Sequence, residues 1–185
     1  MLAFLAIASW TAAVSAAPSV PDSVTATDPF HMGSRYWSVA EGVSYDKGYG
    51  PIYSTQIHGG YFVVDNVAIE YGAQVGYVES ERTSPGALGG PQLGLRWHVL
   101  KRGRWSTYLD GSVGAMFQQH PISQDSLKFN FDVQAGGGES YRLSQAAMAL
   151  AGFRWHHLSN AGIHGKARNL GYDGPMLYVE FQHAF

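Results

Sequence analysis

The residues whose types and spacing could do chemistry are His157 and Ser159, near the end of an alternating segment. In an extended strand, residues i and i+2 point to the same face, with their Cα atoms about 6.5–7 Å apart. The imidazole Nε2 can then reach the serine Oγ, which is the contact that a general base makes with the hydroxyl it activates. The pair therefore predicts a nucleophilic serine beside its base, provided that both residues end a strand.

The chain around this pair predicts eight strands, because apolar and polar residues alternate along most of its length. The predicted strands are 35–45, 52–64, 67–79, 91–100, 105–117, 127–136, 145–159 and 174–185. From the second strand onward, the large apolar residues fall at odd-numbered positions, whereas even-numbered positions carry charged and polar residues with many glycines. In the first strand, Glu41 interrupts the apolar face. His157 and Ser159 are odd-numbered, so we expect them on the apolar face.

The composition excludes several classes of site. The chain has 185 residues, which is enough for one ordinary domain, and its net charge of −2 gives no sign of a nucleic-acid partner. It contains no cysteine, which excludes disulfides, thiolate metal ligands and a cysteine nucleophile. No histidine spacing typical of a metal site is present, so we expect neither a metal nor a cofactor.

The first residues predict export. Residues 1–16 form an apolar run that ends in small residues, which is typical of a signal peptide cleaved before Ala17. A short membrane anchor is the alternative, but the run falls short of the about 20 residues that a membrane span needs. Residues 17–34 are rich in Ser, Thr, Pro and Asp and predict an irregular N-terminal arm, which leaves 35–185 as the folded domain.

Three features favour an outer-membrane barrel: the export signal, the polar face with its many glycines, and the terminal aromatic Phe185 with Val179 and Phe181 on its own face. Strands of about 10–13 residues match a tilted membrane span, and eight is the smallest even number for such barrels. We therefore predict an all-β fold, an eight-stranded antiparallel transmembrane β-barrel of the bacterial outer membrane. A soluble, exported, lipocalin-like barrel is the alternative.

The predicted topology gives the His–Ser pair a position. With both termini in the periplasm, the strand that carries the pair runs outward and ends at the outer leaflet. The aromatic girdles follow from the same topology: Trp37, Trp97 and Trp105 fall near the periplasmic interface, and Trp155 falls near the outer one. A polar pair on the lipid face of the outer rim is either strand-end decoration or a site for a lipid substrate.

The stretch from His157 to Gly162, HLSNAG, resembles the His-x-Ser-Asn-Ala-Gly motif of the PagL family of outer-membrane lipid A 3-O-deacylases. The specific match covers residues 152–174, with a looser echo at 130–132 and at the glycines 136–138. The resemblance implies Ser159 as nucleophile and His157 as base in ester hydrolysis through an acyl-enzyme. It also makes Asn160 and Gly162 candidates to stabilise the oxyanion.

The resemblance also implies partners, namely lipopolysaccharide with its lipid A and the lipids of the outer membrane; a homodimer is left open. Phe153 and Trp155 are candidates to hold acyl chains, with ordinary lipid-facing residues as the alternative. Lys166 and Arg168 are candidates to meet lipid A phosphates, with solvated loop charges as the alternative.

The sequence departs from the family at the acid, a Glu on the last strand that orients the histidine. Aligning the Asp-Gly dipeptide at 173–174 places Met176 at the Glu position, whereas counting back from the C-terminus places Pro175 there. Asp173 is the nearest carboxylate of matching parity, and Glu180 is predicted to face inward. Asp173 therefore replaces the Glu, or the site works as a dyad, or the chain is a non-catalytic barrel with a structural, adhesion or ligand-binding role.

Overall fold

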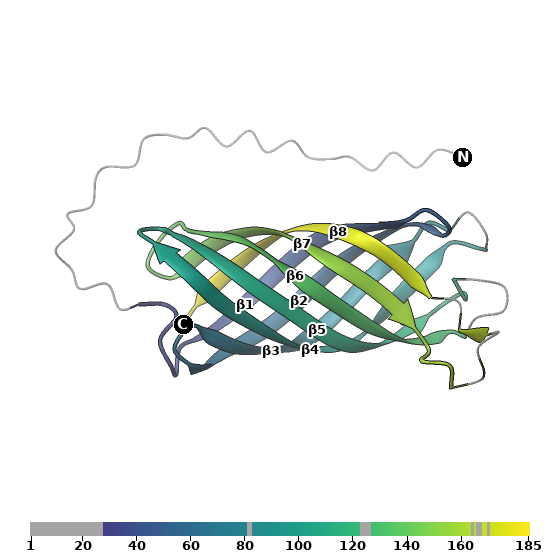
Figure 1. The fold of residues 1–185 in the computed structure, drawn as a ribbon, viewed down its shortest axis with the longest axis horizontal. Coiled ribbons are helices and arrows are strands. Elements are labelled where there is room, and N and C mark those ends of the chain that lie inside the picture. The colour runs from purple at the N-terminus through teal and green to yellow at the C-terminus, as the bar shows by residue number, and fades with distance from the viewer. Residues whose placement is uncertain (1–27, 81–82, 123–126, 164, 166–167, 170) are drawn as a thin grey trace.

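The computed structural model describes residues 28–80, 83–122, 127–163, 165, 168–169 and 171–185, which form one closed antiparallel barrel (Figure 1). Its strands are β1 (Arg35–Asp46), β2 (Gly50–Val64), β3 (Val67–Val78), β4 (Gly86–Arg102), β5 (Trp105–Gln118), β6 (Phe129–Arg142), β7 (Ala147–Ser159) and β8 (Tyr172–Ala184). Each strand pairs with the next, and β8 closes on β1. The predicted fold class is confirmed. The predicted signal peptide and residues 17–27 of the predicted arm lie outside the described residues.

Two predicted strand boundaries were wrong by five residues or more. β4 begins at Gly86 instead of residue 91, and β6 continues to Arg142 instead of ending at residue 136. The glycines 136–138 lie within β6, at positions where a side chain would clash with the neighbouring strands: a Cβ atom on Gly136 would overlap the carbonyl oxygen of Phe153. The run of glycines at which the predicted strand ended is here a condition for strand pairing on both sides.

β8 begins at Tyr172, two residues earlier than predicted. Asp173 is consequently part of the strand and is not a loop residue. Its position along the strand is fixed by the pairing of β8 with β7, in which His157 and Asp173 are direct cross-strand partners. This register decides which side chain of β8 can reach the histidine.

The two faces of the sheet separate as the alternation predicts. Outward-facing residues of the strands include Tyr53, Ile57, Tyr71, Val75, Leu93, Leu95, Leu109, Val113, Leu177 and Val179, all of them exposed. Glu41 is also exposed on this face, where both of its carboxylate oxygens accept hydrogen bonds from Thr55 Oγ1. Among the described residues, no helix is long and apolar enough to cross a membrane.

The interior is layered, which the simple alternation did not predict. A belt of charged and amide side chains occupies its middle, and Arg96 lies at its centre with no exposed surface, 2.7 Å from Glu180 and 3.3 Å from Glu70. Arg154 pairs with Asp110 at 2.6 Å. The inward prediction for Glu180 is confirmed, and its carboxylate is committed to Arg96.

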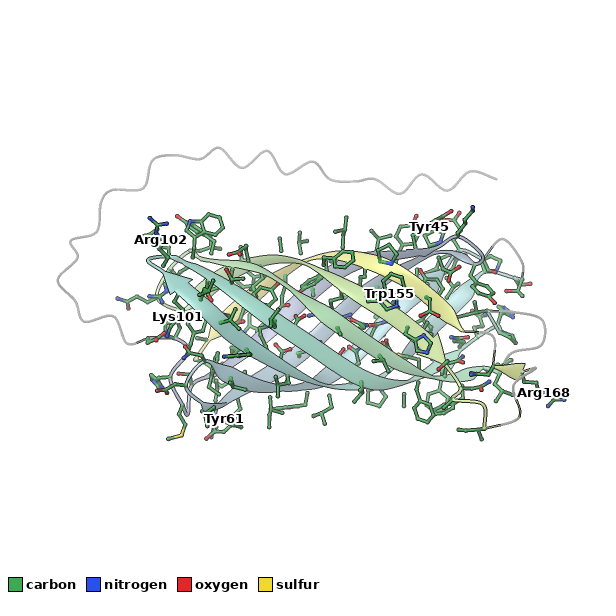
Figure 2. All side chains as sticks on the ribbon, viewed as in Figure 1. Tyr45, Tyr61, Lys101, Arg102, Trp155 and Arg168 are labelled. Carbon is green, nitrogen blue, oxygen red and sulfur yellow. The ribbon has the colours of Figure 1, made fainter. Side chains whose placement is uncertain are left out.

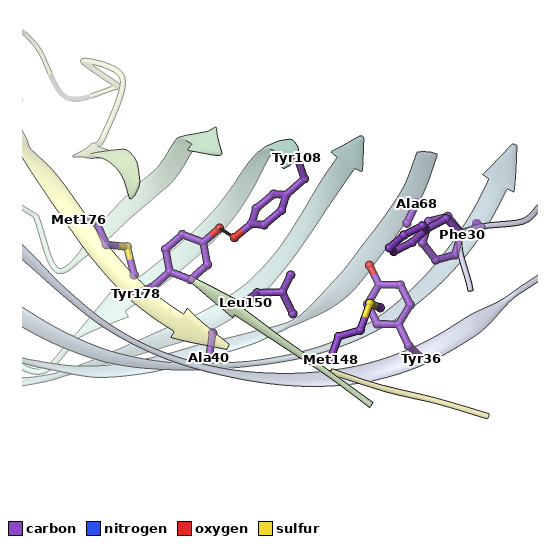
Figure 3. Close-up of a cluster of buried hydrophobic side chains, with 10 residues drawn as sticks. Phe30, Tyr36, Ala40, Ala68, Tyr108, Met148, Leu150, Met176 and Tyr178 are labelled. Atoms are coloured by element: carbon purple, nitrogen blue, oxygen red, sulfur yellow. Dashed lines mark hydrogen bonds between the residues drawn. The ribbon is translucent and has the colours of Figure 1, made fainter. Parts of the chain in front are cut away.

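Apolar clusters close the interior on both sides of this belt. The cluster nearer the end where β1 begins and β8 ends includes Phe30, Tyr36, Phe62, Met148 and Tyr178. In it the hydroxyls of Tyr108 and Tyr178 are hydrogen-bonded at 2.8 Å (Figure 3). The other cluster includes Ile52, Met116, Leu158 and Tyr172. The barrel therefore holds a packed core, and its chemistry has to be sought on the outer wall or at the loops.

Strand direction places the predicted site far from the start of β1 and from the C-terminus. β1 begins and β8 ends at the same end of the barrel, and β7 runs away from that end (Figure 1). Ser159 is the last residue of β7 and so lies at the opposite rim. The tryptophans divide as predicted. Trp37, Trp97 and Trp105 lie toward the end of the barrel where β1 begins and β8 ends, and Trp155 lies toward the opposite end, where β7 ends.

Candidate active site

His157 joins Ser159 to Asp173 on the outer wall of the barrel. Its Nε2 lies 2.9 Å from Ser159 Oγ, and its Nδ1 lies 2.7 Å from Asp173 Oδ1. An ionised carboxylate only accepts hydrogen bonds, so the Nδ1 nitrogen carries the hydrogen. In the neutral ring this leaves Nε2 as the acceptor of the serine hydroxyl hydrogen. The three side chains thus have the arrangement of a nucleophile, a base and the acid that orients the base.

The short aspartate reaches the histidine because the two residues are directly opposite each other on neighbouring strands. Directly opposed residues have Cβ atoms about 4.5–5.5 Å apart, whereas diagonal neighbours are about 7–8 Å apart. Of the two positions that the family alignment offered, Met176 points into the barrel with 1% of its surface exposed. Pro175 faces outward but is opposite Trp155, two residue pairs further from the rim, so only a longer side chain there would reach His157.

Two further residues, Asp46 and Trp155, hold Asp173, and neither role was predicted from the sequence. The backbone N–H of Asp173 donates to Asp46 Oδ2 at 2.8 Å, across the seam between β8 and β1. Trp155 Nε1–H donates to Asp173 Oδ1 at 3.2 Å. The neighbouring Gly174 permits this seam, because a Cβ atom there would overlap the carbonyl oxygen of Tyr45.

The turn after Ser159 has an unusual backbone. Ala161 and Gly162 follow each other with positive φ angles of 53° and 71°. The strained alanine is held by Asn160, whose Oδ1 accepts the Gly162 N–H at 2.9 Å and whose Nδ2 donates to the carbonyl of Arg168. Asn160 has no exposed surface. Both predicted oxyanion residues therefore hold the turn in this structure, and their oxyanion role stays a prediction.

The site is open on the outside of the barrel. Ser159 is half-buried, and the side chains of His157 and Asp173 keep 37% and 51% of their surface exposed. Ser159 is the cross-strand partner of Phe131, whose ring packs edge-on against Phe129 at 5.2 Å between centroids. Apolar surface thus adjoins the serine on the side away from Asp173.

The remaining predicted residues lie at different distances from this centre. Phe153 and Trp155 share the outward face of β7 and are about half exposed. Arg168 lies in the segment between β7 and β8, exposed at the same end of the barrel as Trp155 (Figure 2). Lys166 lies outside the described residues. No group of three or more histidine, aspartate or glutamate side chains within the described part of the chain is arranged to hold a metal ion.

A second Ser–His–Asp set lies inside the barrel. His156 Nδ1 is 2.8 Å from Ser44 Oγ, and His156 Nε2 is 3.2 Å from Asp132 Oδ1. Each of these residues has at most 1% of its surface exposed. No ester can reach this serine through the packed core, so the set belongs to the interior hydrogen-bond network.

The family model of PagL, lipid A 3-O-deacylase, matches residues 25–182, which is most of the chain. The chain belongs to the PagL family. This membership confirms the resemblance seen in the HLSNAG motif, and together with the fold it indicates the bacterial outer membrane. No curated protein gives a significant match over the whole sequence.

This PagL-family chain shares its fold with solved outer-membrane barrels of low sequence identity. Neisserial surface protein A aligns with a TM-score of 0.60 at 12% identity, over 82% of this chain and 96% of that one. OprG of Pseudomonas aeruginosa aligns with a TM-score of 0.56 at 11% identity, over 84% and 97%. The N-terminal barrel domain of OprF from Pseudomonas aeruginosa gives 0.51 at 18% identity, over 83% and 98%.

Proposed function

We propose that this protein is an outer-membrane serine esterase that removes an ester-linked acyl chain from lipid A, in the manner of a 3-O-deacylase. Ser159 is the nucleophile, His157 the general base and Asp173 the acid that replaces the family's glutamate. The observation that carries the proposal is the continuous hydrogen-bonded chain from Ser159 Oγ through His157 to Asp173. Membership of the PagL family supports the substrate class.

The geometry supports a two-step hydrolysis. His157 Nε2 takes the proton from Ser159 Oγ as the oxygen attacks the ester carbonyl, and the imidazolium that forms is stabilised by Asp173. The bond between the carbonyl carbon and the sugar oxygen then breaks, and Nε2 returns its proton to that oxygen. A water molecule, deprotonated by the same nitrogen, attacks the carbonyl carbon of the acyl-serine. The bond from that carbon to Ser159 Oγ then breaks, Nε2 returns the proton to Oγ, and a free fatty acid leaves. Every proton in this sequence passes through one imidazole nitrogen.

The location of the site suits a substrate held in the outer leaflet. The three side chains face outward at the rim opposite the end where β1 begins and β8 ends. An acyl chain that lies in the membrane can remain there while its ester reaches Ser159, so the substrate need not enter the packed barrel. The aromatic surface at Phe131 and Phe129 lies beside the serine, where the first carbons of such a chain would run.

Replacing Ser159 by alanine tests the proposal. We expect the variant to remain a folded barrel that migrates differently on a gel before and after heating, and to lose release of hydroxy fatty acid from lipopolysaccharide. Ser44→Ala is the matched control, because Ser44 also contacts a histidine nitrogen but lies inside the core. Mass spectrometry of lipid A measures the result. Unchanged deacylation by folded S159A would overturn the assignment and favour a non-catalytic barrel.

A further inference from the structure

Trp155 makes a polar contact that its place on the lipid-facing wall does not require. Its indole Nε1–H donates to Asp173 Oδ1 at 3.2 Å, the same oxygen that accepts the Nδ1–H of His157 at 2.7 Å. The indole is about half exposed, and water or lipid headgroups at the membrane interface satisfy such an N–H without help from the protein. The contact therefore ties a surface tryptophan to the acid of the candidate site.

Asp173 needs a second donor because it is not buried. About half of its side-chain surface is exposed, and nothing packs around it as protein does around the acid of an enclosed triad. A carboxylate with one partner can rotate about its side-chain bonds and exchange that partner for water. With two N–H groups aimed at Oδ1 from one strand, the side chain is restricted to the orientation in which it faces the histidine.

The strand geometry makes this arrangement rigid. Trp155 and His157 are two residues apart on β7 and share the outward face. Asp173 is directly opposite His157, and its backbone N–H is fixed to Asp46 Oδ2 at 2.8 Å. The backbone of the acid is thus held from β1, and its side chain is held from β7.

We propose that Trp155 is a positioning residue that acts on catalysis through Asp173, in addition to any contact it makes with lipid. This inference rests on the proposed function, since it assigns Trp155 a role in the orientation of His157. It differs from the sequence-based prediction, in which Trp155 contacts acyl chains. A positioning role affects the rate of the chemical step for every ester, whereas an acyl contact affects binding and grows with chain length.

The test is a double-mutant cycle in the full-length, folded barrel with a short-chain p-nitrophenyl ester as probe. Trp155→Phe keeps an aromatic ring in the interface but removes the N–H donor. We expect kcat to fall about 3- to 10-fold with KM unchanged, which corresponds to the net contribution of one ordinary hydrogen bond, because water can partly replace the lost donor at this exposed site. In the Asp173→Ala background the same substitution should change kcat by less than about twofold, because the acceptor is gone.

Trp97→Phe is the matched control. Trp97 has the same 49% exposure as Trp155 and faces outward, but it lies near the opposite end of the barrel. We expect W97F to keep the kcat and KM of the unmodified protein, which separates a positioning effect from a general effect of losing one interfacial indole.

Three results would overturn the inference: a W155F enzyme with unchanged kcat, an equal loss of rate in both backgrounds, or a loss confined to KM that grows with acyl-chain length. The last result would instead establish Trp155 as an acyl contact. None of them affects the proposed function as long as S159A is inactive, whereas an active S159A would overturn the proposed function itself.

Discussion

Asp173 gives the most demanding test of the site, because the family's glutamate is missing and the structure supplies a replacement. We predict that Asp173→Ala lowers kcat/KM without abolishing it, and that adding Pro175→Glu restores part of the loss. Position 175 faces outward on β8, two residues along the strand from position 173. A glutamate there is one methylene longer than aspartate and extends diagonally toward His157 Nδ1.

The magnitude follows from the exposure of the pair. A hydrogen bond to a charged group contributes about 1.5–3 kcal/mol, which corresponds to about 10- to 150-fold in rate. Loss of the acid in an enclosed serine-protease triad costs about 10⁴-fold. Because His157 and Asp173 keep 37% and 51% of their side-chain surface exposed, water can partly replace the lost contact. We therefore expect D173A to lose about 10- to 150-fold in kcat/KM and not 10⁴-fold. The P175E addition should recover only part of this loss, since its diagonal reach loses side-chain entropy.

The assay is release of hydroxy fatty acid from purified lipopolysaccharide in detergent, with kcat/KM measured for the unmodified protein, D173A and D173A/P175E. Leu177→Glu in the D173A background is the control. Position 177 also faces outward on β8, but it lies two residues beyond position 175 and so further from His157. Full activity of D173A would show that His157 and Ser159 work as a dyad. A D173A/P175E enzyme no better than D173A/L177E would refute the argument that opposed and diagonal positions are alternative sites for the acid.

Two further predictions concern stability. Arg96→Met leaves the carboxylates of Glu70 and Glu180 buried without their cation, so we expect the unfolding free energy to fall by about 3–5 kcal/mol. Urea titration of the barrel in detergent measures this loss. The control is Arg35→Met at an exposed position, which should leave the unfolding free energy nearly unchanged. Burial raises the pKa of Asp28, but its hydrogen bond and charge pairing with Lys101 outweigh this and lower the pKa below the usual value. The ion pair that attaches residues 28–34 to Lys101 should therefore be fully formed above about pH 4 and weaken as the pH falls through the lowered pKa. Amide exchange at Phe30 should then become faster. An exchange rate that does not depend on pH, once corrected for the intrinsic rate, would contradict this prediction.

The sequence was sufficient for the parts of the structure that depend on local alternation. A period of two assigned nearly every outward residue, and the parity of His157 and Ser159 alone predicted that they share a face. The glycines of β6 could not be predicted to continue a strand, since a Cβ clash with Phe153 exists only after β7 has paired. The inward apolar clusters were also not predicted. Alternation assigns each residue to a face but not to a layer, and the belt of paired charges occupies only the middle layer of the barrel.

The contacts of Asp173 mark the limit of sequence reasoning more sharply. Its partner Asp46 is 127 residues away in the chain, and the two meet only because β8 closes on β1. The parity of Asp173 was predictable, but its register opposite His157 was not, because a slip of two residues along β8 keeps every side chain on its face. The same slip would put Pro175 opposite the histidine. Which residue serves as the acid is thus decided by long-range strand register.

His156 and His157 show why the outer wall is where catalysis is possible. Each contacts a serine and an aspartate, and the two histidines are neighbours on β7, but only His157 has a serine two residues further along its own strand. The strand sends them to opposite faces. His156 enters a core that is fully packed, where the hydrogen bond between its Nδ1 and Ser44 Oγ reduces the cost of burying that serine. His157 faces outward, where a lipid ester can approach Ser159 while its acyl chain stays in the membrane. One residue of register therefore separates a structural hydrogen-bond network from a site that can act on a lipid.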